Sequence, residues 1–221
     1  MLPAIFGDTS TMTDLQDKVW YACYGSNMLE ERFLCYIEGG QPRGATTNYK
    51  GCSDKTLPTE SEEFYICSEL YFAKQSTNWK NGGIAFIRTH FEPQASTMAR
   101  MYLINKGQLV DIARQETKTE AKLVLDFDTT VKEGSSIFKR PSWYGNLVYL
   151  GDQNNHPIFT LTNENNILPL TKPSENYLRI IIKGIREAHN FDDKTIFEYL
   201  NKKQGIVDNY TDKELSNLFN D

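Results

Sequence analysis

The sequence has no surplus of positive charge and no long hydrophobic run. Its 221 residues include 24 Lys and Arg against 29 Asp and Glu, for a net charge of -5. Nucleic-acid binding needs cationic side chains that neutralise phosphates, so this balance disfavours a nucleic-acid partner. Apolar stretches such as 178–182 fall far short of the roughly 18 residues that cross a membrane. The N-terminal residues also lack the pattern of a signal peptide, and we therefore expect a cytoplasmic protein without a membrane partner.

Cysteine and histidine are scarce, and their spacing fits no metal site. Four cysteines stand 12, 17 and 15 residues apart, which suits reduced thiols better than a zinc pattern. Three widely separated histidines make a zinc site built by the protein improbable. The chain also lacks a Gly-x-Ser-x-Gly elbow, and Cys23 falls inside an apolar segment, so no hydrolase triad is indicated. We expect neither a metal nor another cofactor.

The remaining composition is that of a folded protein, with 39% hydrophobic and 12% aromatic residues. At roughly 150 residues per domain, the length favours one enlarged domain. We predict a flexible arm over residues 1–17, a single domain over 18–190 and a helical extension over 191–221 that packs on this domain. Both periodicities occur, so the fold class is α+β.

The local patterns predict the elements of that fold. Runs of aromatic and β-branched residues indicate strands, and apolar residues spaced three and four apart indicate helices. Between them, residues 41–63 form an irregular excursion that is longer than an ordinary connection. Strands are predicted at 18–24, 64–73, 83–88, 98–104, 121–127, 147–150 and 157–161, and helices at 27–39, 106–117, 174–190, 193–200 and 215–219.

The turn that follows the first predicted strand is the first candidate site. It consists of Tyr24, Gly25, Ser26 and Asn27 and leads directly into a helix. Unpaired N–H groups at such a helix start attract anions, and a glycine allows a ligand to approach the backbone closely. In a purely structural alternative, Gly25 only makes the turn and Asn27 only caps the helix, with Glu30 completing a capping box.

Two further side chains stand on the apolar faces of predicted helices. Glu116 shares a face with Leu109 and Ile112, so its carboxylate should point inward, where desolvation would raise its pKa toward that of a general base. Alternatively it turns to solvent or pairs with a neighbouring Arg or Lys. Tyr177, in the first turn of the helix after Ser174, either lines a pocket or is an ordinary core tyrosine. The glycine pair at 82–83 suggests a bulge or a close backbone contact.

Taken together and in this order, the motifs resemble the γ-glutamylcyclotransferase-like family over residues 18–190. The resemblance implies a small mixed β-barrel flanked by helices. The helical C-terminal extension goes beyond a minimal domain of this family, and the excursion at 41–63 is enlarged. The sequence departs from the family pattern where Thr117 follows Glu116, a position at which glycine is frequent. The motifs that carry the resemblance are Tyr24-Gly25-Ser26-Asn27, Trp79 with Gly82-Gly83-Ile84-Ala85, Asn105-Lys106, Gln115-Glu116 and Pro173-Ser174-Glu175-Asn176-Tyr177.

The resemblance also implies a chemistry without metal or cofactor. The α-amine of a γ-glutamyl amide attacks its own γ-carbonyl, which forms 5-oxoproline and releases the free amine. In this scheme Glu116 is the general acid/base, while Tyr24, Gly25, Ser26, Asn27 and Tyr177 bind the glutamyl group. The partner is therefore a small γ-glutamyl amine or peptide. The sequence determines neither the leaving amine nor the oligomeric state.

Two other functions remain open at this point. One is a catalytically silent binding or regulatory protein that keeps the pocket of the same fold. The other is an interaction module, in which Leu215, Leu218 and Phe219 form a docking stripe on the last helix. The alternative for that stripe is packing within the chain itself.

Overall fold

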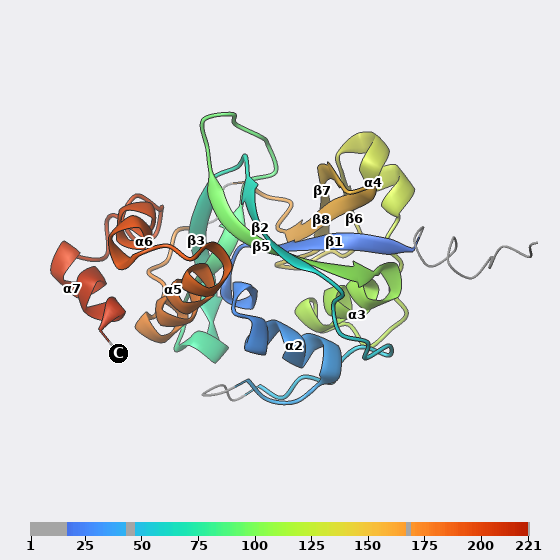
Figure 1. Cartoon of the computed structure of the whole chain (residues 1–221), viewed down its shortest axis with the longest axis horizontal. Helices are drawn as coiled ribbons and strands as arrows, with labels where there is room; N and C mark the ends of the chain where they lie inside the picture. Colours follow the sequence, from blue (N-terminus) through green and yellow to red (C-terminus); the bar gives the residue numbers. More distant parts are fainter. Residues whose placement is uncertain (1–16, 43–46, 167–168, 221) are drawn as a thin grey trace, which may run out of the picture.

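The computed structural model describes residues 17–42, 47–166 and 169–220, so nearly all of the predicted arm at 1–17 lies outside the described residues. Within that part, helices and strands mix along the chain (Figure 1), which confirms the α+β class. The elements are β1 Lys18–Cys23, η1 Ser26–Met28, α2 Glu30–Glu38, β2 Ser61–Ile66, β3 Leu70–Ser76, η2 Thr77–Trp79, β4 Gly82–Ile87, β5 Thr97–Asn105, α3 Lys106–Glu116, α4 Phe127–Glu133, β6 Ser135–Ile137, β7 Asn146–Gln153, β8 His156–Thr162, α5 Glu175–His189, α6 Asp193–Leu200, α7 Asp212–Ser216 and η3 Asn217–Phe219.

Six of the strands form one mixed sheet in the order β2-β5-β1-β8-β7-β6. Its centre is β1, which runs antiparallel to β5 and parallel to β8. Strands β3 and β4 form a separate antiparallel hairpin. The mixed sheet of the prediction is therefore present, and hydrogen bonding between the described strands leaves it open at β2 and β6.

Strand β1 carries no charged residue from Val19 to Cys23 and is buried over this stretch, because both faces of the sheet are covered. Alternate side chains enter two different cores. In the first core, Trp20 and Ala22 pack with the β3–β4 hairpin and α5. In the second core, Val19, Tyr21 and Cys23 pack with α2 and α3. The end of β1 thus lies between two covered faces, and the chain emerges there into the 24–27 turn.

The strand predicted at 64–73 is in fact two strands, β2 and β3. The chain bends at Ser68, whose amide donates to the Ile66 carbonyl at 2.8 Å. The Ser68 hydroxyl donates to the Arg88 carbonyl at 2.7 Å, and the Ser68 carbonyl accepts from the Thr97 hydroxyl at 2.6 Å. These contacts hold a bend that local composition does not reveal. As a result, β2 pairs with β5 while β3 pairs with β4.

The prediction of a strand at 121–127 is wrong. No described residue pairs with this segment, which runs irregularly to Asp126 and then becomes α4. Asp126 caps α4 by accepting from the Thr129 amide at 2.9 Å. Leu123 and Leu125 do pack on the second core, so the alternation that suggested a strand reflects burial of an unpaired segment.

The C-terminal helices pack on the first core. Leu215 is fully buried and Leu218 nearly so, so these two residues of the candidate docking stripe pack within the chain, as the alternative for that stripe proposes. The Arg179 guanidinium donates to the carbonyls of Asn217, Leu218 and Asn220 at 2.9 to 3.1 Å. The last turn of the chain is therefore fastened to α5 through both apolar packing and its own carbonyl groups.

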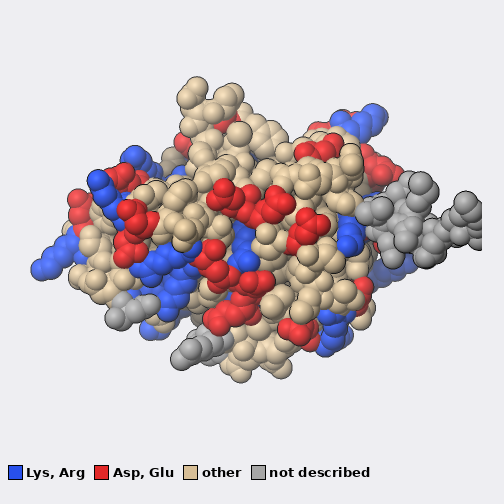
Figure 2. Space-filling view, in the orientation of Figure 1, with Lys and Arg blue, Asp and Glu red and all other residues tan. Residues whose placement is uncertain are grey.

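Acidic side chains gather on the face where β2 and β5 pass above α2 and α5 (Figure 2). Within this face Arg100 is mostly buried and pairs with Glu30 at 3.0 Å and with Glu187. The network joins β5, α2 and α5 directly behind the 24–27 turn. None of the helices in the described part of the chain has the length and apolarity of a membrane span.

Candidate functional site

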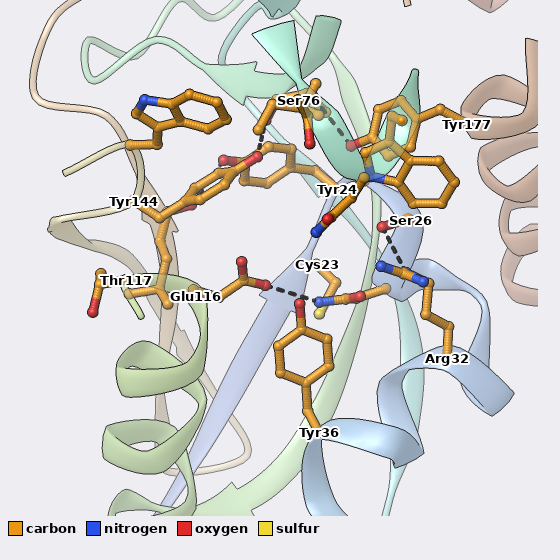
Figure 3. Close-up of a pocket in the computed structure, with 18 of the residues that line it drawn as sticks. Cys23, Tyr24, Ser26, Arg32, Tyr36, Ser76, Glu116, Thr117, Tyr144 and Tyr177 are labelled. Atoms are coloured by element: carbon orange, nitrogen blue, oxygen red, sulfur yellow. Dashed lines mark hydrogen bonds between the residues drawn. The ribbon is translucent and has the colours of Figure 1, made fainter. Parts of the chain in front are cut away.

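A cavity of about 340 Å³ opens beside the end of β1. Its wall is built by the 24–27 turn, α2, β4, the end of α3, the segment before β7 and the start of α5 (Figure 3). All six residues proposed from the sequence line this cavity. They are Tyr24, Gly25, Ser26, Asn27, Glu116 and Tyr177.

The 24–27 turn is held from behind by the sheet. The Tyr102 hydroxyl lies 3.2 Å from the Asn27 carbonyl and 3.3 Å from that of Met28, so it can donate to either. Arg100 also donates to the Met28 carbonyl at 3.4 Å. Because β5 supplies these donors, the turn is fixed by long-range contacts, and its other side remains free to face the cavity.

Gly25 is required by space rather than by backbone conformation. Its φ of -122° is accessible to any residue. A Cβ at this position, however, would lie 3.1 Å from the Tyr177 hydroxyl oxygen and 3.4 Å from the Ala85 Cβ. The glycine therefore allows the turn to approach the tyrosine that lines the opposite wall.

Asn27 does not cap the helix, contrary to the structural alternative. Leu29 occupies the N-cap position of α2 and makes no side-chain capping bond. The Asn27 side chain turns inward instead, and its amide donates to Glu116 Oε1 at 3.3 Å (Figure 3). Its Oδ1 is buried and has no hydrogen-bond partner among the described residues. A buried acceptor without a partner destabilises the protein, and a hydrogen-bond donor of a ligand would remove this cost.

Glu116 ends α3 and points into the cavity, as its helical face predicted. A capping box between Asn105 and Gln108 starts this helix and so fixes its register. Burial raises the pKa of Glu116, while hydrogen bonds from Tyr36 and Asn27 and the nearby Arg32 charge oppose the shift. The side chain keeps some accessible surface only because it faces the cavity. The result is a carboxyl group with elevated proton affinity beside a helix-start turn.

The alternative partner for Glu116 is engaged elsewhere, since Arg114 pairs with Asp111 at 3.4 Å. Thr117, which stands where the family often has glycine, has an ordinary φ of -92°. Its hydroxyl donates to the Ala113 carbonyl at 2.7 Å, so it terminates the helix without strain. The left-handed position falls one residue later, at Lys118.

Tyr177 combines both roles that the sequence left open. The hydroxyl accepts from the Ala85 amide at 3.2 Å, and burial raises its pKa to about 12. Tyr144 donates to the carbonyl of the same Ala85 at 2.8 Å. Two tyrosines thus hold the two backbone groups of one residue of β4 at the cavity wall. Tyr177 therefore stabilises β4 through its contact with Ala85, and the same hydroxyl group lies beside Gly25 of the turn.

The glycine pair at the start of β4 provides the predicted close backbone contact. A Cβ on Gly83 would lie 2.2 Å from the Thr171 carbonyl oxygen, and the Gly83 amide donates to the Lys172 carbonyl at 2.9 Å. This contact brings β4 against the segment that leads into α5. It therefore sets the distance between Ala85 and Tyr177.

Arg32 and its partners are site residues that sequence reasoning missed. Arg32 donates from Nε to the Ser26 hydroxyl at 3.0 Å and from Nη2 to the Tyr49 hydroxyl at 2.9 Å. Its guanidinium lies 4.9 Å from the centre of the Trp79 ring. A charged residue beside the apolar face of the predicted helix was the available signal, because Arg32 stands four residues before Tyr36.

The irregular excursion after α2 contributes to the wall as well. Tyr49 forms a short bridge with Gly40, and its ring packs against that of Tyr36 with centroids 4.2 Å apart. Gln115 fastens the excursion by accepting from the Gly51 amide at 3.2 Å. Within the described ranges, no group of three or more His, Cys, Asp or Glu side chains is placed to hold a metal ion.

Comparison with known sequences finds a curated relative but no matching family model. The chain is 32% identical over 215 residues to histone deacetylase 5 of Arabidopsis thaliana, and the match covers 88% of this chain and 32% of that protein. The chain thus spans about a third of the length of the curated relative it matches. The name of that relative describes the longer protein.

Comparison with solved structures finds several similar chains. A gamma-glutamyl cyclotransferase is 20% identical, with a TM-score of 0.48 over 88% of this chain and 92% of the other. An uncharacterized protein from Homo sapiens gives 20% identity and a TM-score of 0.49 over the same shares. YkqA from Bacillus subtilis gives 14% identity and 0.45, over 88% of this chain and 58% of the other. The solved structures similar to this chain therefore include a gamma-glutamyl cyclotransferase.

Proposed function

We propose that this chain is an enzyme that cyclises the γ-glutamyl group of a γ-glutamyl amine or peptide to 5-oxoproline and releases the free amine. One observation carries the proposal. The Glu116 carboxyl, with its pKa raised by burial, stands on the wall of a cavity beside the 24–27 turn, and the Asn27 side chain of this turn donates to it. This pairing of a proton acceptor and an anion-binding turn suits an intramolecular aminolysis.

The turn would grip the amino-acid end of the substrate. Backbone N–H groups at the start of η1 favour a carboxylate or a developing oxyanion. The unpaired Asn27 Oδ1 can accept from the α-ammonium group, and the same side chain already touches Glu116. The substrate amine would then lie next to the group that must deprotonate it.

Glu116 would transfer protons in both directions. It takes one proton from the α-ammonium, whose pKa in solution is about 7.7 to 8.0. The free amine forms a C–N bond to the γ-carbonyl carbon, and Glu116 returns the proton to the nitrogen of the scissile amide. That C–N bond breaks, and the second proton on the ring nitrogen leaves through Glu116 to the released amine. A carboxyl with raised pKa narrows the gap to the ammonium and makes each transfer easier.

The cavity would contribute by positioning. Amine and carbonyl of an extended glutamyl chain lie apart, and cyclisation requires the chain to fold back on itself. A pocket walled by Tyr177, Tyr144 and the 24–27 turn can hold the folded form of the substrate. Holding it there raises the effective concentration of the amine at the carbonyl. The external leaving group would project through the open side of the cavity.

The test is mass-spectrometric detection of 5-oxoproline after incubation with a panel of γ-glutamyl amines, γ-glutamyl dipeptides and glutathione. We expect product from the wild-type protein and none above background from Glu116→Gln, with both proteins folded by circular dichroism. Turnover retained in Glu116→Gln would overturn the assignment of this residue. No product from the wild type, together with a rise in melting temperature on adding a panel compound, would favour the catalytically silent binding protein.

A further inference from the structure

We propose that Tyr36 and Tyr49 are positioning residues that, together with Arg32, hold Glu116 through a chain of hydroxyl groups that reverses direction whenever Glu116 gains or loses a proton. This inference rests on the proposed function, because it assigns a task to groups around the same carboxyl. It involves the irregular excursion, which otherwise has no part in the chemistry. We call Arg32, Tyr49, Tyr36 and Glu116 the hydroxyl chain.

The geometry of the hydroxyl chain is continuous. Arg32 Nη2 donates to the Tyr49 hydroxyl oxygen at 2.9 Å, and the hydroxyls of Tyr36 and Tyr49 are 3.1 Å apart. Tyr36 and Glu116 line the same cavity, and a hydrogen bond from the Tyr36 hydroxyl opposes the rise in the Glu116 pKa. Figure 3 shows Tyr36 rising from α2 toward that carboxyl. Arg32 thus connects to Glu116 through two hydroxyl groups without touching it.

The direction of donation depends on the charge of Glu116. Arg32 has no acceptor, so the Tyr49 oxygen always receives from it at one end. When Glu116 is ionised, Tyr36 donates to the carboxylate and Tyr49 donates to Tyr36. When Glu116 is protonated, its own proton can point to the Tyr36 oxygen, and Tyr36 then donates to Tyr49 across the 3.1 Å between their oxygens. In the ionised state each hydroxyl proton of the chain has an acceptor within it, whereas in the protonated state the proton of the half-buried Tyr49 hydroxyl turns to solvent. Two hydroxyl protons turn between the two states.

The surrounding structure keeps the two tyrosines in register. Their rings pack with centroids 4.2 Å apart. Gln115 donates to the Tyr36 carbonyl at 3.0 Å and accepts from the Gly51 amide at 3.2 Å, so α3 ties α2 to the excursion. Arg32 is mostly buried, and its second bond holds Ser26 of the turn. The chain therefore links the anion-binding turn to the acid/base.

Other titratable groups also face Glu116 and bear on its protonation. Apart from Arg32 they are uncharged at neutral pH, since burial raises the pKa of each neighbouring tyrosine and of Cys23. Arg32 therefore supplies a fixed positive charge, and Glu116 is the group of the hydroxyl chain whose charge changes. The groups are Tyr21, Cys23 and Tyr24 from β1 and the turn, Arg32 and Tyr36 from α2, Tyr49 from the excursion, Tyr144 from the segment before β7 and Tyr177 from α5.

The experiment is a carboxyl titration by NMR of protein carrying ¹³C-labelled glutamate, with the Glu116 signal assigned by its loss in Glu116→Gln. Removing the Tyr36 hydroxyl takes a donor from the ionised carboxylate, so Tyr36→Phe should raise the Glu116 pKa by about one unit. Tyr49→Phe should raise it by less, because Tyr49 acts through Tyr36. The double variant should match Tyr36→Phe alone, since without Tyr36 the chain is already broken.

Tyr71→Phe is the matched control. It removes another mostly buried hydroxyl, which donates to the Asn165 carbonyl at 3.2 Å and does not belong to the hydroxyl chain, and it should titrate like the wild type. Where 5-oxoproline forms, the acid limb of kcat/KM should move to higher pH in the same order, with activity recovered at alkaline pH.

Two results would overturn the hydroxyl chain. One is a Glu116 pKa in Tyr36→Phe equal to that of the wild type, and the other is additive effects of the two substitutions. Because the titration needs no turnover, it remains decisive if the wild type forms no product. Active wild type with unshifted variants would reject the chain and leave the proposed enzyme standing.

Discussion

Two arginines, Arg179 and Arg32, show how differently two regions of the molecule use their polar groups. In the C-terminal region, the Arg179 guanidinium donates to three carbonyls of the last turn. At the cavity, Arg32 binds Ser26 and Tyr49, but its Nη1 is buried without a partner among the described residues. Asn27 Oδ1 in the same wall is also unpaired. Arg179 therefore stabilises the fold, whereas under the proposed function the two unpaired atoms of the cavity wall would bind a ligand.

Substitution of Glu116 should have the largest effect on the cavity side of this contrast. Loss of a general acid/base lowers turnover on the order of 10²–10⁴-fold, so Glu116→Gln should abolish detectable 5-oxoproline at ordinary enzyme concentrations. Its fold should persist, because a glutamine can still accept from the Asn27 amide. Initial rates and thermal melts measured on the same preparation check both halves, and a variant that unfolds would leave the contrast unsupported.

The reverse pattern is expected from Leu215→Ala. Leu215 is fully buried in the first core, and truncation of such a side chain costs about 2–5 kcal/mol. Chemical denaturation should show this loss, while kcat/KM of the folded protein at low temperature stays near that of the wild type. A large fall in kcat/KM without a fall in stability would mean that the two regions are not separable.

Gly25→Ala tests the cavity wall by steric means. The added methyl group would meet the Tyr177 hydroxyl oxygen at 3.1 Å, and overpacking of this kind typically costs about 1–3 kcal/mol. We expect kcat/KM to fall about tenfold, mainly through KM, as the turn moves away from the opposite wall. Steady-state kinetics measure this fall. In Gly25→Ala/Tyr177→Phe the clashing hydroxyl is absent, so this double variant should relieve the steric part of the effect. Unchanged kinetics would show that the turn does not hold the substrate.

The smallest effect expected is a pH-dependent difference in stability between the wild type and Glu116→Gln. Burial raises the pKa of Glu116 in the folded state. Its contribution to stability is therefore fully present below the ordinary glutamate pKa and is lost as pH rises through the folded value. Glu116→Gln should gain in melting temperature over the wild type across that window and keep the gain at neutral pH. Parallel curves at all pH values would contradict the raised pKa.

The sequence supports predictions where the signal is local. Period-2 and helical patterns place β1, α3 and α5 correctly, and they orient Glu116 toward the interior. The resemblance to a known family selects the six residues that the structure brings to one cavity. Each of these signals lies within a few residues of the group it concerns, which is why one sequence suffices to find it.

Other features depend on contacts between distant segments and stay hidden. Asn27 faces the cavity instead of capping the helix because its carbonyl accepts from the Tyr102 hydroxyl. Tyr102 stands 75 residues further along the chain. Tyr49 enters the wall only through the packing of the excursion on α2. The segment at 121–127 alternates like a strand but finds no partner in the sheet among the described residues. In each case tertiary contacts override or complete the local preference.

The most direct test of the central claim is the stoichiometry of the reaction with the best γ-glutamyl substrate of the panel. Cyclisation releases 5-oxoproline and free amine in equal amounts and forms no glutamate. The account predicts this one-to-one release from the wild-type protein and its loss in Glu116→Gln. Free glutamate in place of 5-oxoproline, or equal rates in the two proteins, would contradict the account.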